Sequence, residues 1–364
     1  MRLMERFQHG GNIYEEAPPG KEWLDFSANI NPLGLPQRAR EAILRHVGDL
    51  IHYPDPQARE LKAAISSRYG VPQEEILLGN GAAELLYLFF ARMRFSRVLL
   101  PQPSFSDYER AALSAGSRAE YLFLEPERGF SLPLEEICRR IPSADCAVFC
   151  NPNNPTGNLL SREDLETSLE AAKGKTWILV DESFLDFCED GENRTLRHLV
   201  KKYPRLFVLQ SLTKFYALPG LRLGFGIASM EAVKGMEEAK DVWNVNLLAQ
   251  KAGVEALGDE EYRQTTLQWL SEERAYMEAA LGALPGMQVF RPSVNFVLVN
   301  VEKTGRNPWA ILSAMKERGI LLRNCGNYPS LNENYIRMAI RSHEDNLRLM
   351  AAWEEVLCEE GGGV

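Results

Sequence analysis

Short apolar runs rich in β-branched residues alternate with longer amphipathic runs through residues 50–230. A strand buried on both faces reads as a continuous apolar run, whereas the helix that covers it repeats every three to four residues. The alternation is therefore typical of βαβ units and predicts an α/β fold with a mostly parallel sheet. The predicted strands are residues 97–100, 120–124, 146–150, 177–180, 206–210 and 223–227, and the predicted helices are residues 57–69, 82–93, 161–173 and 195–202.

The pattern changes after residue 230, where long charged amphipathic runs replace the short strands. It predicts a smaller α+β domain, with strands near 288–290 and 295–301 and helices near 308–318 and 343–358. The first 45 residues are rich in Gly, Pro and Asn, which predicts an ordered arm more than a strand–helix unit. We therefore expect three parts: an arm packing with the small domain (1–45), a large cofactor-binding domain (46–235) and a C-terminal small domain (236–364).

Composition excludes several classes of protein. The 364 residues are 45% hydrophobic and 25% charged, which is typical of a globular enzyme, and the net charge of −9 gives no attraction to nucleic acid or to an anionic membrane. The apolar run 85–91 is far shorter than the ~20 residues that cross a bilayer. Residues 1–7 lack the basic start and long apolar stretch of a secretory signal, so we expect none. We expect a cytoplasmic protein. The cysteines and histidines lack metal-binding spacing, so we expect reduced thiols and no metal.

Asn154, Asp181 and Lys214 each lie just after a predicted strand, where open α/β sheets bind their ligands. Their segments read Asn-Pro-Asn-Asn-Pro-Thr-Gly, Val-Asp-Glu and Ser-Leu-Thr-Lys. A lysine taken alone is as a rule a solvated surface charge. The three segments together, in this order and spacing, resemble the pyridoxal-phosphate enzymes of fold type I, which share the aspartate-aminotransferase fold.

This resemblance implies a role for each residue toward pyridoxal 5'-phosphate. Lys214 would attach the cofactor covalently, and Asp181 would keep the pyridine nitrogen protonated, because a carboxylate stabilises a neighbouring cation. Asn154 would donate to the phenolic oxygen. Phe105 would stack on the ring, with Tyr108 behind it.

The resemblance also implies a cradle for the cofactor phosphate, made of backbone N–H groups at a helix start, two hydroxyl groups and an arginine. The residues of this predicted cradle are Gly81, Ala82, Ala83, Ser211, Thr213 and Arg222. Tyr53 resembles the tyrosine that reaches the cofactor phosphate of the neighbouring subunit. It therefore implies a homodimer with shared active sites.

Two families within this fold resemble the chain. The histidinol-phosphate aminotransferases do so over nearly the whole length, but their usual Asp-Glu-Ala-Tyr is Asp-Glu-Ser-Phe here, so Phe184 replaces a phenol that would contact the cofactor. Residues 9–12, 25–34, 327–329 and 337–342 resemble the threonine-phosphate decarboxylases of cobalamin biosynthesis. That family converts L-threonine O-3-phosphate to (R)-1-aminopropan-2-ol O-2-phosphate and carbon dioxide.

The arginines can distinguish these two reactions. The bond at Cα that breaks is the one that stands perpendicular to the cofactor ring, and an arginine that holds an anionic group of the substrate decides which bond that is. The aminotransferases have an arginine at the position of Arg337 and usually glycine at the position of Arg341. Two or three neighbouring guanidinium groups suit a substrate that carries both a phosphate and a carboxylate. The substrate-binding residues expected from this resemblance are His9, Gly10, Asn12, Asn31, Arg323, Arg337 and Arg341.

Three alternatives stay open at this point. The first is a histidinol-phosphate-type aminotransferase. The second is an L-serine O-phosphate decarboxylase, since one methyl group in a pocket is worth only about 1–3 kcal/mol. The third is a regulatory protein that keeps the fold without catalysis, although the chain shows no basic DNA-binding segment.

Overall fold

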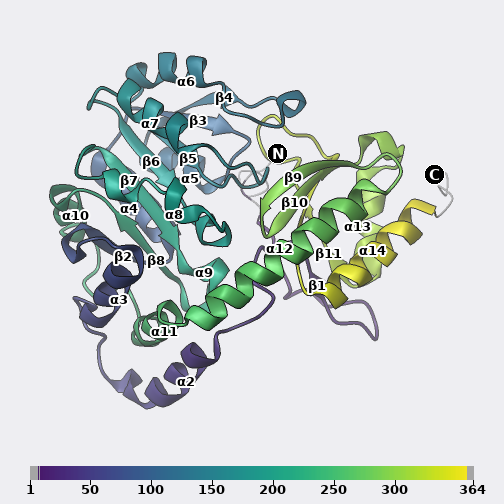
Figure 1. Ribbon diagram of the computed structural model, residues 1–364, viewed down its shortest axis with the longest axis horizontal. Helices are drawn as coiled ribbons and strands as arrows, with labels where there is room; N and C mark the ends of the chain where they lie inside the picture. Colours follow the sequence, from purple (N-terminus) through teal and green to yellow (C-terminus); the bar gives the residue numbers. More distant parts are fainter. Residues whose placement is uncertain (1–6, 8, 359–364) are drawn as a thin grey trace.

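The computed structural model describes residue 7 and residues 9–358, and its chain forms a larger and a smaller unit (Figure 1). The larger unit contains a seven-stranded sheet with helices on its faces, and the smaller contains a four-stranded sheet covered by long helices. The helix α12 (Glu260–Gly282) runs from the larger unit to the smaller one. The α/β prediction is confirmed.

The large sheet has the strand order β2-β8-β7-β6-β5-β3-β4. The strand β8 is antiparallel to both of its neighbours, and all other pairs are parallel, so the sheet is mostly parallel as predicted. Every predicted strand forms, most of them one or two residues longer than predicted. The strands are β2 (Ile76–Asn80), β3 (Arg97–Gln102), β4 (Arg118–Phe123), β5 (Cys146–Cys150), β6 (Trp177–Asp181), β7 (Leu206–Ser211) and β8 (Leu223–Ile227).

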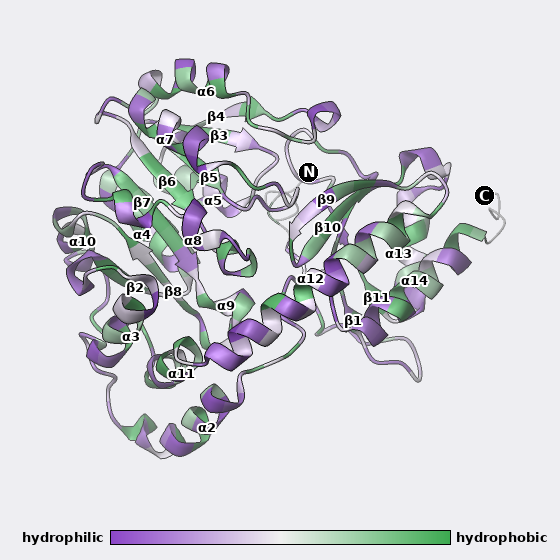
Figure 2. Cartoon of the chain, in the orientation of Figure 1, coloured by the Kyte–Doolittle hydropathy of each residue, from purple (hydrophilic) through white to green (hydrophobic). Residues whose placement is uncertain are grey.

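Helices cover both faces of this sheet, and the apolar residues gather on the strands between them (Figure 2). Three predicted helices form within two residues of their expected bounds, whereas the helices α5, α6, α8 and α9 were not predicted. The helices of this unit are α3 (Arg59–Tyr69), α4 (Ala82–Met93), α5 (Asp107–Ser114), α6 (Leu134–Arg140), α7 (Arg162–Ala171), α8 (Gly191–Arg194), α9 (Leu212–Phe215) and α10 (Met230–Glu237).

The predicted helix at 195–202 is wrong, because only a 3₁₀ turn forms there, at Arg197–Leu199. The carboxylate of Glu182 accepts a hydrogen bond from the Thr195 hydroxyl at 2.6 Å and another from the Leu196 N–H at 2.8 Å. These bonds hold Thr195 in extended backbone geometry, so the apolar periodicity of the segment reflects burial without a helix.

The N-terminal segment contains more regular structure than predicted. The strand β1 (Leu24–Asp25) pairs in parallel with β11 (Ile320–Leu321), and α2 (Gln37–His46) contacts α11 (Leu247–Leu257). The expectation of an arm without a helix is therefore wrong for residues 37–46. The division of the chain at residues 45 and 235 stays a prediction.

The small sheet is antiparallel and has the strand order β12-β13-β10-β9. The strands are β9 (Gln288–Val294), β10 (Phe296–Asn300), β12 (Arg323–Asn324) and β13 (Tyr335–Ala339), and the remaining helices are α13 (Pro308–Glu317) and α14 (His343–Cys358). The two helices match their predicted positions, whereas β12 and β13 were not predicted. Within residues 7 and 9–358, no helix is both long and apolar enough to cross a membrane.

Candidate active site

The carboxyl ends of three neighbouring parallel strands, β5, β6 and β7, meet at one edge of the large sheet. Asp181 ends β6 and lies opposite Cys150, the last residue of β5, while Ser211 ends β7. Lys214 follows in the short helix α9, so the strand order brings the three predicted segments together.

These strand ends face a cavity of about 330 Å³, which is also lined by residues of the N-terminal segment (the arm) and of the smaller unit (the small domain). Most of the predicted site residues line it. They are His9, Gly10, Ala82, Ala83, Phe105, Tyr108, Asn154, Asp181, Ser211, Thr213, Lys214, Arg222, Arg323 and Arg337.

The amine of Lys214 lies inside this cavity and donates a hydrogen bond to Ser211 Oγ at 3.1 Å. Burial lowers the pKa of this amine below its ordinary value, and the charge of Arg222 lowers it further, whereas Asp181 opposes both effects. The Nζ atom also lies 5.8 Å from the centre of the Phe184 ring. A lysine whose pKa is lowered more readily supplies a neutral, nucleophilic amine.

The Asp181 carboxylate is buried and held by two hydrogen bonds. Tyr108 donates its hydroxyl to Oδ2 at 2.7 Å, and the Ser183 N–H donates to Oδ1 at 2.9 Å. Burial and the charge of Asp181 raise the pKa of the Tyr108 hydroxyl well above its usual range, so the phenol stays protonated and continues to donate. The carboxylate therefore has a fixed orientation at the cavity wall.

Asn154 and Arg337 contact each other across the cavity, although they come from the two different units. The Asn154 side-chain oxygen accepts a hydrogen bond from Arg337 Nη1, which leaves the amide N–H₂ group of Asn154 as a donor. Arg337 Nη2 donates to the Ser27 carbonyl at 2.6 Å. Arg337 is only 6% exposed, and burial lowers the pKa of its guanidinium. Within the described part of the chain, its Nε–H has no hydrogen-bond partner.

Arg323 and Arg337 lie directly opposite each other on the antiparallel strands β12 and β13. Both are buried, and both line the cavity. Like charges at directly opposed positions destabilise a sheet unless an anion lies between or beside them. Their pairing therefore gives the cavity a strongly positive wall.

The start of α4 forms an anion cradle with Arg222. The N-cap residue Gly81 gives the helix no side-chain cap, so its first N–H groups are available to a ligand. A Cβ atom at Gly81 would lie 2.5 Å from Arg222 Nη2, and one at Gly224 would lie 2.4 Å from the Ala82 nitrogen. Glycine at these two positions lets the Arg222 side chain and the β8 backbone lie close against the start of α4. The hydroxyl oxygens of Ser211 and Thr213, which also line the cavity, lie 2.7 Å apart.

Five predicted site residues are not among those that line the cavity: Asn12, Asn31, Tyr53, Gly81 and Arg341. Gly81 instead lies close against the guanidinium of Arg222. Asn12 donates to Glu15 at 3.0 Å, on the exposed part of the arm. Tyr53 is 77% exposed and stacks on Trp243, with ring centres 4.4 Å apart.

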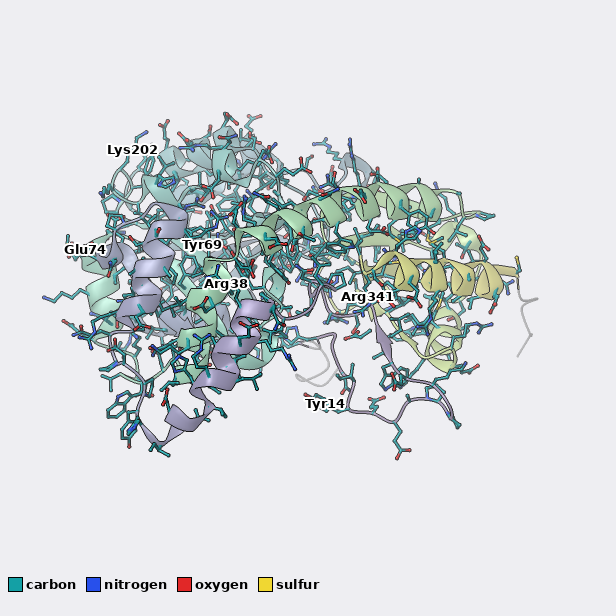
Figure 3. The ribbon with its side chains drawn as sticks, turned by 60° about the horizontal axis from the view of Figure 1, so that its bottom comes forward. Tyr14, Arg38, Tyr69, Glu74, Lys202 and Arg341 are labelled. Carbon is teal, nitrogen blue, oxygen red and sulfur yellow. The ribbon has the colours of Figure 1, made fainter. Side chains whose placement is uncertain are left out.

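Asn31 and Arg341 have protein partners instead. The Asn31 side chain donates to the Phe215 carbonyl at 2.8 Å and so ties the N-terminal segment to the helix that carries Lys214. Arg341 lies just before α14 (Figure 3), where it forms an ion pair with Asp345 at 3.0 Å and donates to the Asp25 carbonyl at 3.2 Å. The structure brings neither side chain into the cavity.

Sequence reasoning missed several residues of the cavity wall. Cys150 could have been found, because it ends a predicted strand beside the one that leads to Asp181. Ser27 lies in a segment that carried the resemblance, but its role depends on a long-range contact with Arg337. Asp107 begins a helix that was not predicted, so no local signal indicated it.

Comparison with known proteins shows the family. The family "Aminotransferase class I and II" matches residues 21–352. The chain belongs to this family.

It is 37% identical to the threonine-phosphate decarboxylase of Salmonella typhimurium, over 96% of each chain. It is 35% identical to the histidinol-phosphate aminotransferase of Desulfitobacterium hafniense, over 91% of each chain. The crystal structure of L-threonine-O-3-phosphate decarboxylase from Porphyromonas gingivalis superposes with a TM-score of 0.81 at 25% identity, covering 92% of this chain and 99% of that one.

Proposed function

We propose that this class I/II aminotransferase-family enzyme decarboxylates L-threonine O-3-phosphate to (R)-1-aminopropan-2-ol O-2-phosphate and carbon dioxide, as a step of cobalamin biosynthesis. In this reaction the bond between Cα and the carboxylate breaks, carbon dioxide leaves, and a proton takes its place on Cα. The observation that carries the proposal is the pair of buried guanidinium groups, Arg323 and Arg337, in the cavity that contains Lys214. Two such groups suit a substrate with both a phosphate and a carboxylate.

The cofactor is pyridoxal 5'-phosphate. The residues present fit it, because Arg222, two hydroxyl groups and the uncapped start of α4 offer hydrogen-bond donors to a phosphate, while a lysine and a carboxylate line the same cavity. When bound, the cofactor supplies an electron sink for the pair of electrons that the broken Cα bond releases. Its phosphate would be held by Arg222, the Ser211 and Thr213 hydroxyls and the N–H groups at the start of α4.

The protein residues each have a defined part in this proposal. Lys214 would attach the cofactor through Nζ and carry a proton to and from the reacting centre. Asp181 would hold a proton at the pyridine nitrogen, and the free N–H₂ group of Asn154 would donate to the phenolic oxygen. Phe105 would stack on the cofactor ring. Phe184 provides no hydroxyl at the position where the aminotransferases usually have one.

The alternatives make different products, which gives a direct test. We expect purified protein to release carbon dioxide from L-threonine O-3-phosphate, and to show no 2-oxoglutarate-dependent transamination of histidinol phosphate above a few per cent of that rate. Transamination without carbon dioxide release would overturn the proposal. A parallel assay with L-serine O-phosphate measures the contribution of the substrate methyl group, for which we expect a preference of roughly ten- to a hundred-fold.

Arg337→Ala should reduce kcat/KM for phosphothreonine by roughly a hundred-fold, because it removes a buried charge-assisted contact with the anionic substrate. Arg341→Gly provides the comparison, since Arg341 was also predicted to bind substrate. From its ion pair with Asp345 we expect less than about a three-fold loss. Steady-state kinetics of both variants checks this. Equal losses would show that Arg341 leaves Asp345 to contact the substrate.

The enzyme is proposed to act as a homodimer with shared active sites. Exposed apolar side chains lie around Tyr53 in the sequence, and a single chain leaves them in water. They are Leu44, Val47, Leu50 and Ile51. A second copy of the chain would cover them and would bring Tyr53 to the neighbouring cofactor phosphate.

We place this homodimer in the cytoplasm, whose reducing conditions suit six free cysteines.

Subunit complementation tests the shared site. We expect that a heterodimer of one Lys214→Ala chain and one Tyr53→Phe chain, co-expressed with different tags and purified, will contain one intact site. Its activity at limiting cofactor should reach about half that of the wild-type dimer. If the heterodimer is no more active than the mean of the two variant homodimers, Tyr53 does not act across the interface.

A further inference from the structure

An ion pair joins the N-terminal arm to the large domain at the cavity wall. His9 Nε2 lies 3.2 Å from Asp107 Oδ1, although 98 residues separate the two in sequence. The His9 side chain is 41% exposed and that of Asp107 is 13% exposed, and both residues line the cavity. The His9 ring centre also lies 5.4 Å from that of Phe105, the residue proposed to stack on the cofactor.

The backbone next to His9 fixes its approach to the cavity. A Cβ atom at Gly10 would lie 2.2 Å from the Ser27 carbonyl oxygen, so only glycine allows the arm to pass this close. The Gly11 N–H donates to Ser27 Oγ at 2.7 Å. Because the same Ser27 carbonyl accepts from Arg337, the arm and the buried arginine are held by one residue.

The position of Asp107 suits a negatively charged side chain. It lies in the first turn of α5, where the helix dipole stabilises a carboxylate. Among the residues that the structure describes, His9 is the basic side chain within ion-pair distance of this carboxylate. A carboxylate that accepts from one ring nitrogen fixes the orientation of an imidazole, and in a ring that carries both protons the other nitrogen is also a donor.

We propose that Asp107 is a positioning residue, which holds His9 so that Nδ1–H donates to the phosphate group of the substrate. The inference rests on the proposed function, because it assigns the arm to recognition of a phosphorylated substrate. Asp107 acts through His9 and does not itself touch the anion. The arm thereby adds a hydrogen-bond donor to the wall formed by Arg323 and Arg337.

A double-mutant cycle on the cofactor-loaded enzyme tests this assignment. Asp107→Asn and His9→Gln should each raise KM for phosphothreonine about ten-fold with kcat within about two-fold of wild type. The double variant should match His9→Gln alone, because Asp107 has no effect once His9 is absent. The ion-paired His343, which does not line the cavity, provides the matched control, and His343→Gln should leave both constants unchanged.

Binding of inorganic phosphate gives a second measurement that does not depend on turnover. Calorimetric titration should show that Asp107→Asn weakens phosphate binding about ten-fold in the wild-type background and not in the His9→Gln background. Losses that add in the double variant, a fall in kcat without a change in KM, or no phosphate binding to the wild type would each overturn the inference. If Asp107 and His9 prove to be coupled in phosphate binding but the enzyme releases no carbon dioxide from phosphothreonine, the proposed function alone is rejected.

Discussion

Lys214→Ala is expected to abolish turnover, with a loss of at least roughly a thousand-fold, and to prevent covalent attachment of the cofactor. Lys214 Nζ is the lysine amine that lines the cavity in the described part of the chain. Its lowered pKa makes it the group best suited to attack a carbonyl carbon. Borohydride reduction followed by peptide mass spectrometry should locate the cofactor on Lys214 in the wild type and nowhere in the variant.

Lys214→Arg is the matched control for charge. Arginine keeps a cation beside Ser211 and Asp181, but a guanidinium stays protonated and cannot attach the cofactor. We therefore expect it to be as inactive as the alanine variant, while phosphate binding at the start of α4 persists. Turnover at a wild-type rate in either variant would exclude the proposed chemistry.

Residues next to strand ends were predictable from the sequence, because strand position alone placed them. Asn154, Asp181 and Lys214 each follow an apolar run that is easily recognised, and parallel strands bring their carboxyl ends together. The same reasoning fails for the segment at 195–202, where a buried Glu182 carboxylate replaces helical hydrogen bonds with bonds to side-chain oxygens.

Contacts that depend on register or on a distant segment could not be predicted. Arg323 and Arg337 were each expected to bind substrate, but their direct opposition depends on β12, which is two residues long, and on the unpredicted β13. Arg341 and Asn31 were also expected to bind substrate, but the structure places them outside the cavity. Each lies near the site in sequence, but Asp345 and the Phe215 carbonyl hold their side chains outside the cavity.

Two aromatic rings connect the cations on opposite sides of the cavity. Phe184 faces Lys214 and packs edge-on against Phe296, with ring centres 5.2 Å apart. Phe296 in turn lies 5.5 Å from the guanidinium carbon of Arg337. An aromatic face attracts a cation without neutralising it. The two rings can therefore hold the Lys214 amine and the Arg337 guanidinium in place and leave their charge for the cofactor and the substrate.

Asp181→Asn should reduce kcat by roughly a hundred- to a thousand-fold while the cofactor stays bound. The amide has nearly the same shape as the carboxylate but lacks the negative charge that keeps the pyridine nitrogen protonated. Because the phosphate cradle and Lys214 contact other parts of the cofactor, its occupancy should change little. Absorbance of the bound cofactor and the initial rate of carbon dioxide release measure the two quantities separately.

Tyr108→Phe separates the charge of Asp181 from its orientation. This change removes the hydrogen bond to Oδ2 but keeps the carboxylate, so we expect a loss of about three- to ten-fold. If Asp181→Asn retained the wild-type rate, its carboxylate would serve only to accept the hydrogen bonds of Tyr108 and Ser183. Equal losses in the two variants would mean that the orientation of Asp181 matters and its charge does not, because only the asparagine removes the charge.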